Sequence, residues 1–147
     1  MICHKIFIEM DVRKINLLLL SIWWGAFTFY SGIVINVGMQ VLGSHTEMGF
    51  ITQVVTGYIN FISLPIFAFV AYTVRSEKRF FIVAIFLVLL QVVLFLLHFE
   101  LDKLLDFEQR VVLNKLVFYS LHRIYLLIST VIWLIVCGVL FFLVKRK

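Results

Sequence analysis

Residues 80–99 read FFIVAIFLVLLQVVLFLLHF, a run of twenty positions without a Lys, Arg, Asp or Glu. An α-helix rises 1.5 Å per residue, so a run of about 20 apolar residues is long enough to cross the hydrocarbon core of a bilayer. Three further blocks, 15–44, 48–74 and 124–144, also lack these four charged residue types. The sequence therefore predicts an all-α protein, a polytopic up-and-down bundle of four transmembrane helices over about 15–38, 55–74, 80–99 and 121–144.

The composition agrees with a membrane protein and excludes several other classes. Of the 147 residues, 63% are hydrophobic and 14% are charged, whereas soluble domains average roughly 45–50% apolar and about 25% charged residues. A small soluble fold buries too little of its surface to hide so many apolar side chains. This argues against a soluble enzyme, a disordered chain and a basic nucleic-acid module. We expect residues 1–147 to form one domain that has the lipid bilayer as its surroundings.

The charge distribution predicts an orientation. With four spans, both termini and the 75–79 turn share one side, and this side holds nine of the 13 Lys and Arg residues. The other side holds the remaining four, Lys103, Arg110, Lys115 and Arg123. Because Lys and Arg near span ends stay in the cytoplasm, we expect a multi-pass inner-membrane protein with cytoplasmic N- and C-termini. This asymmetry accounts for the net charge of +5, and no nucleic-acid partner is expected.

Two segments are expected on the outer side. Ser44-His45-Thr46-Glu47 has the spacing of a capping box, so a helix should begin near His45 and either lie in the interface or run on into the second span. In residues 100–120 the apolar residues recur every three or four positions, which predicts an amphipathic helix. This second helix would lie on the membrane surface or extend the fourth span. The extension is favoured because no Gly or Pro occurs from residue 103 up to Gly138, near the end of the fourth span.

Small and polar residues predict how the helices pack. In lipid, helices associate where small residues let their backbones approach. The first span carries such residues on one face, namely Ser21, Gly25, Thr28, Gly32 and Asn36. The second span carries a similar face that includes Asn60 and Ser63. We expect the two faces to meet, with Asn36 and Asn60 forming interhelical hydrogen bonds. The alternative is that these residues line a substrate path.

Three histidines gather on the outer side of the predicted topology. His98 and His122 lie at the outer ends of two helices, and His45 lies with Glu47 in the first outer segment. Imidazole is a common ligand of haem iron and of transition metals, so His98 and His122 are candidate haem ligands and His45 with Glu47 is a candidate metal site. The competing interpretation is that these side chains bond to water and lipid headgroups at the boundary, and proton handling is a third option.

Part of the sequence resembles small four-helix bacterial membrane proteins of unknown function. The resemblance rests on two groups of residues, the first running from Trp24-Gly25 through Gly49-Phe50-Ile51-Thr52-Gln53 to Asn60, and the second comprising Phe118-Tyr119, His122-Arg123, Tyr125, Ser129 and Trp133. It implies a four-helix bundle without an established activity. A more distant likeness, the aromatic-Gly run in a helix near a histidine, is to the HemJ-type protoporphyrinogen oxidases and the CopD-like copper-resistance proteins. That likeness implies His45, His98 and His122 as ligands.

Two functions therefore follow from the sequence. The first is a non-enzymatic helical-bundle subunit or interaction module that contacts a second copy or another membrane protein. The second is a membrane-embedded haem- or metal-binding redox protein. The chain contains no G-x-x-x-x-G-K-[ST] loop and no G-x-S-x-G elbow, so it lacks the common nucleotide-binding and serine-hydrolase motifs.

Overall fold

The computed structural model describes the backbone of residues 2–145 and the side chains of residues 12–145. The first long helix is α1 (Ile2–Phe29), which continues through the π-helical turn η1 (Tyr30–Val34) into α2 (Ile35–Leu42). In η1 the Ile35 N–H donates to the Tyr30 carbonyl oxygen, five residues back, which is the hydrogen bond of a π-helix. The first membrane-crossing rod thus contains one widened turn.

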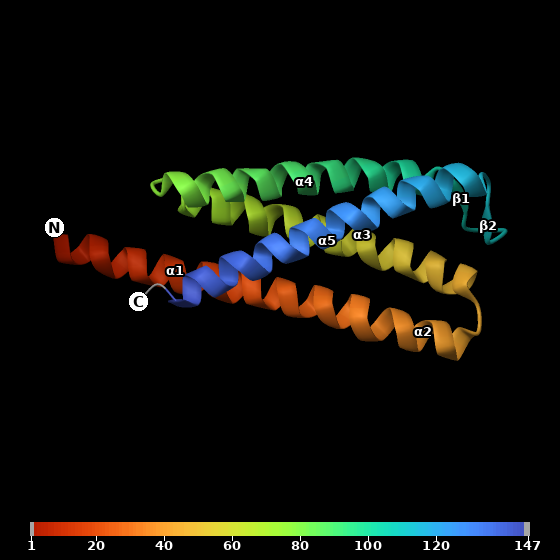
Figure 1. Cartoon of the computed structure of the whole chain (residues 1–147), viewed down its shortest axis with the longest axis horizontal. Coiled ribbons are helices and arrows are strands. Elements are labelled where there is room, and N and C mark those ends of the chain that lie inside the picture. The colour runs from red at the N-terminus through yellow and green to blue at the C-terminus, as the bar shows by residue number, and fades with distance from the viewer. Residues whose placement is uncertain (1, 146–147) are drawn as a thin grey trace.

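Three more long helices complete the bundle, α3 (His45–Thr73), α4 (Lys78–Asp102) and α5 (Lys115–Lys145). A short antiparallel hairpin of β1 (Leu105–Asp106) and β2 (Val111–Val112) joins α4 to α5. Consecutive long helices run in opposite directions (Figure 1). The predicted all-α four-helix bundle is confirmed.

The four rods form a closed ring of contacts, because α1 packs on α3, α3 on α4, α4 on α5, and α5 on α1. The beginning of α1, the end of α5 and the α3–α4 turn lie at one end, the terminal end (Figure 1). The α2–α3 connection and the β hairpin lie at the other end, the hairpin end. Helix α5 crosses the bundle diagonally, close to α1 at the terminal end and away from α2 at the hairpin end.

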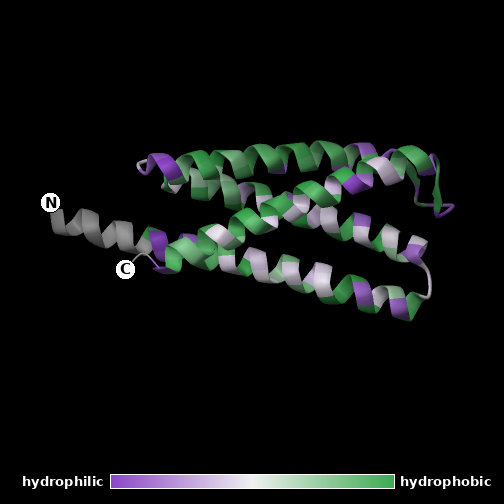
Figure 2. Ribbon diagram, viewed as in Figure 1, coloured by the Kyte–Doolittle hydropathy of each residue, from purple (hydrophilic) through white to green (hydrophobic). Residues whose placement is uncertain are grey.

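All four rods are long and apolar enough to cross a membrane, so the chain is a multi-pass membrane protein. Polar residues concentrate at the two ends, and α4 is apolar over almost its whole length (Figure 2). Large apolar side chains such as Phe61 and Leu127 are exposed on the outside of the bundle, where lipid would surround them. Each helix satisfies its own backbone hydrogen bonds, which is the requirement for crossing the hydrocarbon core.

Every rod contributes at least one fully buried apolar side chain to the core, and these side chains include Leu20, Phe67, Leu87 and Ile132. The indole of Trp23 packs edge-on against Phe67, with ring centroids 5.0 Å apart. Its Nε1–H donates to the Ser63 hydroxyl at 2.6 Å. The centre of the bundle therefore combines close packing with satisfied polar groups.

The first outer segment forms as its capping residues predict. Gly43 ends α2 in the left-handed conformation (φ +61°), which glycine adopts without a Cβ penalty. The Ser44 side chain then accepts a hydrogen bond from the Glu47 N–H at 3.3 Å. Helix α3 begins at His45 and continues to Thr73. Of the two expected arrangements, the one in which this segment runs on into the second span is correct.

The amphipathic helix predicted over residues 100–120 is wrong for its middle part. Asp106 accepts from the N–H groups of Glu108 at 3.0 Å and Gln109 at 2.9 Å, which closes a turn instead of a helix. Arg110 follows with a φ of +53°. The extension of the fourth helix is correct only from Lys115, where the Asn114 side chain caps α5 by accepting from the Val117 N–H at 3.2 Å.

The predicted meeting of two small-residue faces is wrong for α1. Ser21, Gly25, Gly32 and Asn36 are exposed, and the Asn36 amide donates to the Gly32 carbonyl oxygen of its own helix at 2.7 Å. Helix α1 instead turns a larger stripe toward the bundle, in which Asn16, Leu20, Trp23 and Tyr30 are buried. Aromatic side chains on this stripe remove more apolar area from lipid contact and add stacking, so they determine the packing face.

Candidate ligand-binding cavity

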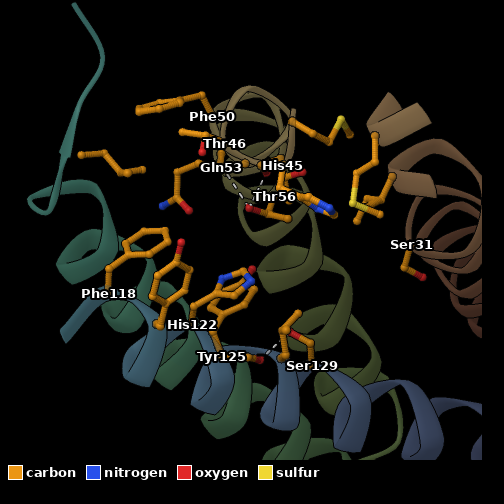
Figure 3. A pocket seen from close by; sticks show the side chains of 18 of the residues that line it. Ser31, His45, Thr46, Phe50, Gln53, Thr56, Phe118, His122, Tyr125 and Ser129 are labelled. Carbon is orange, nitrogen blue, oxygen red and sulfur yellow. Dashed lines mark hydrogen bonds between the residues drawn. The ribbon is translucent and has the colours of Figure 1, made fainter. Parts of the chain in front are cut away.

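A cavity of about 370 Å³ lies inside the hairpin end of the bundle (Figure 3). Its size falls in the range of pockets that hold small molecules. It extends along α3 from His45 to Thr56, which at 1.5 Å per residue is roughly 16 Å of depth. The first rod (α1, η1 and α2) forms one wall of the cavity, α3 and α5 form the others, and the hairpin lies at its end. The lining residues are Phe27, Tyr30, Ser31, Ile35, Met39, His45, Thr46, Met48, Gly49, Phe50, Thr52, Gln53, Thr56, Leu105, Val112, Phe118, Tyr119, His122, Tyr125, Leu126 and Ser129.

The cavity is open to the surface of the bundle near the hairpin end, at His45, Thr46, Gly49 and Tyr119, and also between η1 and α5. Ser31 on η1 and Leu126 on α5 both line the cavity and are exposed on the outer surface. Between them the two rods diverge toward the hairpin end (Figure 1). Nearer the terminal end the same rods are held together by Trp24 and Trp133, whose rings stack at 5.3 Å. This opening between η1 and α5, the mouth, is therefore flanked by two membrane-crossing rods.

Aromatic side chains dominate the wall that α5 contributes. Phe118, His122 and Tyr125 extend from α5 toward α3 (Figure 3). The His122 and Phe118 rings stack with an interplanar angle of 7° and centroids 5.8 Å apart. The His122 imidazole makes no hydrogen bond to any residue that the structure describes. Its ring nitrogens are therefore available to a bound molecule.

The Tyr30 hydroxyl is a buried polar group without a hydrogen bond. Tyr30 is 8% exposed and lies on η1 in the cavity wall. The Thr52 side chain is close enough to influence this hydroxyl, but the contact does not reach the distance and angle of a hydrogen bond. Buried polar groups are nearly always bonded to protein, water or ligand. An unpaired hydroxyl on a π-helical turn, a feature frequent at functional sites, indicates that something polar binds beside it.

The hydroxyl groups of the cavity wall are not activated nucleophiles. Ser31 donates to the Phe27 carbonyl oxygen at 2.8 Å, Thr56 to that of Thr52 at 2.8 Å, and Ser129 to that of Tyr125 at 2.9 Å. No Asp, Glu, Lys, Arg or Cys occurs among the lining residues. Among the described residues, these three hydroxyl groups therefore have no base beside them that would activate them for covalent catalysis.

A polar network of three helices closes the floor of the cavity. The Asn60 amide group of α3 donates to the Tyr125 hydroxyl of α5 at 2.9 Å, and Gln91 of α4 donates to the Asn60 side-chain oxygen at 3.0 Å. All three side chains are buried. Ser129, one turn further along α5, donates to the Tyr125 carbonyl oxygen of its own helix at 2.9 Å. The network fixes the Tyr125 ring where the cavity ends.

The hairpin covers the end of the cavity and is attached to α3 at two points. Phe107 packs edge-on against Phe50 with ring centroids 5.3 Å apart. Arg110 pairs with Glu47 at 3.4 Å. Since Leu105 and Val112 of the paired strands line the cavity, the hairpin acts as its wall at the membrane surface.

The structure places His98 in a separate cluster behind α3. The Gln53 amide donates to His98 Nδ1 at 3.2 Å and to Asp102 Oδ1 at 2.9 Å. His98 Nε2 lies 3.6 Å from Asp102 Oδ2. The ring packs so closely on Gly57 that a Cβ there would lie 3.0 Å from Nε2. His98 joins α4 to α3, and both of its nitrogens already face protein groups.

The predicted ligand residues are therefore only partly brought together. His122 and His45 line the cavity, whereas His98 and Glu47 do not. Glu47 is engaged by Arg110, and within the described residues no group of three or more His, Cys, Asp or Glu is arranged to hold a metal ion. Of the predicted packing residues, Asn60 and Ser63 are buried and bonded between helices, and Thr28 accepts from Trp133 Nε1 at 2.7 Å.

Sequence reasoning did not identify Tyr30 or Gln53 as site residues. Tyr30 follows the buried stripe Asn16, Leu20 and Trp23 at helical spacing, which could have placed it inside the bundle. The π-helical turn that accompanies it has no signature in this sequence. Gln53 lies six residues after Glu47 of the capping box, on the same face as its buried helix neighbours Phe50 and Asn60. Its polarity at membrane depth was the available signal.

Comparisons of the chain with protein-family models, curated proteins and solved structures find no match. The resemblance to small four-helix bacterial membrane proteins, and the distant one to the HemJ-type and CopD-like families, therefore stay predictions.

Proposed function

We propose that the protein is a non-enzymatic binding module of the inner membrane, which holds a lipid-soluble small molecule in the cavity at its hairpin end. The observation that carries this proposal is the opening between Ser31 and Leu126, two exposed residues that line a mostly apolar cavity and lie on membrane-crossing rods. A molecule dissolved in the bilayer could enter there without crossing water. Contact with a second copy or with another membrane protein stays a prediction.

The chemistry of the cavity wall favours binding over catalysis. The wall is aromatic and aliphatic, with neutral hydroxyl, amide and imidazole groups at a few positions, the composition of a site that orients an apolar molecule. The hydroxyl protons of Ser31, Thr56 and Ser129 are already donated to backbone carbonyl oxygens. A charged substrate would lose its hydration here without gaining an opposite charge.

The proposed orientation places the cavity at the outer face of the membrane. Nine of the 13 Lys and Arg residues lie toward the terminal end in the sequence topology, and the positive-inside rule assigns that end to the cytoplasm. Arg75 lies over the Tyr72 ring at 4.6 Å and Lys145 over the Phe141 ring at 4.3 Å, which is how cations settle at a membrane boundary. A fluorescent reporter fused after Lys147 should fold and fluoresce in the cytoplasm. A C-terminus that is reached by a periplasmic reporter enzyme would overturn the orientation.

A matched pair of variants tests the binding function. Thr52 lines the cavity, whereas Val54, two residues further along α3, is exposed on the outside and does not line it. Thr52→Trp should fill the cavity, and Val54→Trp adds the same side chain facing lipid. The probe is decylbenzene carrying a diazirine on its chain, in nanodiscs, with crosslinked residues mapped by mass spectrometry.

We expect the wild type and Val54→Trp to be labelled at cavity residues such as Leu126, and Thr52→Trp to lose this labelling. Equal labelling of all three proteins, or labelling confined to the outer surface of the wild type, would refute the binding function.

A further inference from the structure

We infer that the molecule bound in this cavity is a quinone-type compound, a flat lipid-soluble ring bearing carbonyl oxygens, whose head group accepts hydrogen bonds from Tyr30 and His122. This inference rests on the proposed binding function and names the chemical class of the ligand. It is independent of haem or metal binding.

Two hydrogen-bonding groups in the cavity wall have no partner in the part of the protein that the structure describes. The Tyr30 hydroxyl is unpaired and buried on η1, and the His122 imidazole has no hydrogen bond on α5. A phenol always has an O–H to donate, and a neutral imidazole has one N–H. The two groups belong to different rods that bound the same cavity. A ligand with an acceptor oxygen at each side of its head group would satisfy both.

The aromatic side chains of the cavity wall favour a flat ligand. Five aromatic side chains line the same cavity as these two donors, namely Phe27, Phe50, Phe118, Tyr119 and Tyr125. Aromatic side chains stack on flat conjugated rings and gain more from them than from a flexible acyl chain. A ring with carbonyl groups fits both the aromatic walls and the donors, whereas the acyl chain of a membrane lipid would leave Tyr30 unpaired.

The lining residues also indicate the charge of the ligand's head group. No Lys, Arg, Asp or Glu is among the lining residues, so a phosphate or carboxylate head would be buried without a counter-charge. The ligand head is therefore neutral. Its apolar tail would leave through the mouth between Ser31 and Leu126 into the lipid.

The test compares two probes that differ only in their head groups. One is a decyl-substituted benzoquinone with a diazirine on the chain, and the other is decylbenzene with the same diazirine. Both are titrated into nanodiscs that contain the full chain, and the concentration for half-maximal cavity labelling is measured. The variants are Tyr30→Phe, which removes only the hydroxyl, and His122→Phe, which keeps a ring against Phe118. Tyr58→Phe, at an exposed tyrosine of α3 outside the cavity, is the control.

We expect the quinone probe to label the wild type and Tyr58→Phe at a lower concentration than decylbenzene does. Each of Tyr30→Phe and His122→Phe should weaken quinone labelling about fivefold, the effect of one hydrogen bond, and leave decylbenzene labelling unchanged. Equal labelling by the two probes in the wild type and the variants would overturn the quinone assignment while the binding function stands. Failure of both probes to label the cavity would overturn both.

Discussion

The side-chain amide of Gln91 on α4 donates a 3.0 Å hydrogen bond to the side-chain oxygen of Asn60 on α3, in the buried centre of the bundle. Asn60 in turn bonds to the Tyr125 hydroxyl of α5. Three of the four rods are thus joined through one amide. The same network forms the floor of the cavity, so bundle stability and cavity shape depend on the same residues.

Replacing Asn60 should destabilise the bundle. Asn60→Leu leaves the Gln91 amide and the Tyr125 hydroxyl unpaired in an apolar core, which we expect to cost about 1–2 kcal/mol. The measurement is the thermal unfolding midpoint in detergent. Asn36→Leu is the control, because Asn36 is exposed and bonds only within its own helix. Equal midpoints for the two variants would contradict the role of the network.

The glycines should divide into two groups when they are replaced by leucine. In Gly57→Leu the new side chain collides with the His98 ring, 3.0 Å from the Cβ position, and overpacking of this kind costs about 1–3 kcal/mol. In Gly25→Leu nothing lies within 4 Å of the Cβ, so the better helix propensity should maintain or raise stability. Unfolding midpoints in the same detergent measure both. A larger loss for Gly25→Leu than for Gly57→Leu would show that the α1 face is buried against another molecule.

The hairpin turn should depend on Asp106. Asp106→Ala removes the acceptor of the Glu108 and Gln109 N–H groups, and losing such a turn-closing acceptor costs about 1 kcal/mol. Amide hydrogen exchange should therefore become several-fold faster across residues 107–112. Glu108→Ala, at an exposed position in the same turn, should leave the exchange unchanged. Comparable acceleration in both variants would argue against the Asp106 contacts.

Haem titration tests the redox hypothesis from the sequence. His98 is held by Gln53 and Asp102 and does not line the cavity that His122 lines. We therefore expect purified protein mixed with haemin to develop no Soret band that requires both histidines. An absorption spectrum measures this directly, with His98→Ala and His122→Ala as comparisons. A band in the wild type that both variants lose would contradict our placement of the function in the cavity.

The sequence was sufficient to predict the four rods and the connection between α2 and α3. Charge-free apolar blocks have one stable arrangement in lipid, because only a helix satisfies its own backbone there, and the Ser44–Glu47 spacing determined where α3 begins. The helix faces were harder, because the small-residue stripe of α1 and its buried stripe have the same period. Periodicity alone therefore cannot tell which of Gly25 and Trp23 points inward.

The connection after α4 and the cavity needed three-dimensional information. Apolar spacing in residues 100–120 fits a helix, but the turn at Asp106 and the cap at Asn114 outweigh it. His98 and His122 have similar positions near the ends of their helices, yet Gln53 from a third helix engages only His98. The unpaired state of Tyr30 depends on how the rods around it pack, which no local sequence feature specifies.

The most direct measurement is of the molecule that the protein carries when it is purified. The wild type, Thr52→Trp and Val54→Trp are extracted from membranes in a mild detergent, and native mass spectrometry weighs the protein with any bound ligand. The account predicts one bound apolar molecule of defined mass on the wild type and on Val54→Trp, and none on Thr52→Trp. The same occupancy on all three proteins, or a wild type that carries nothing, would contradict it.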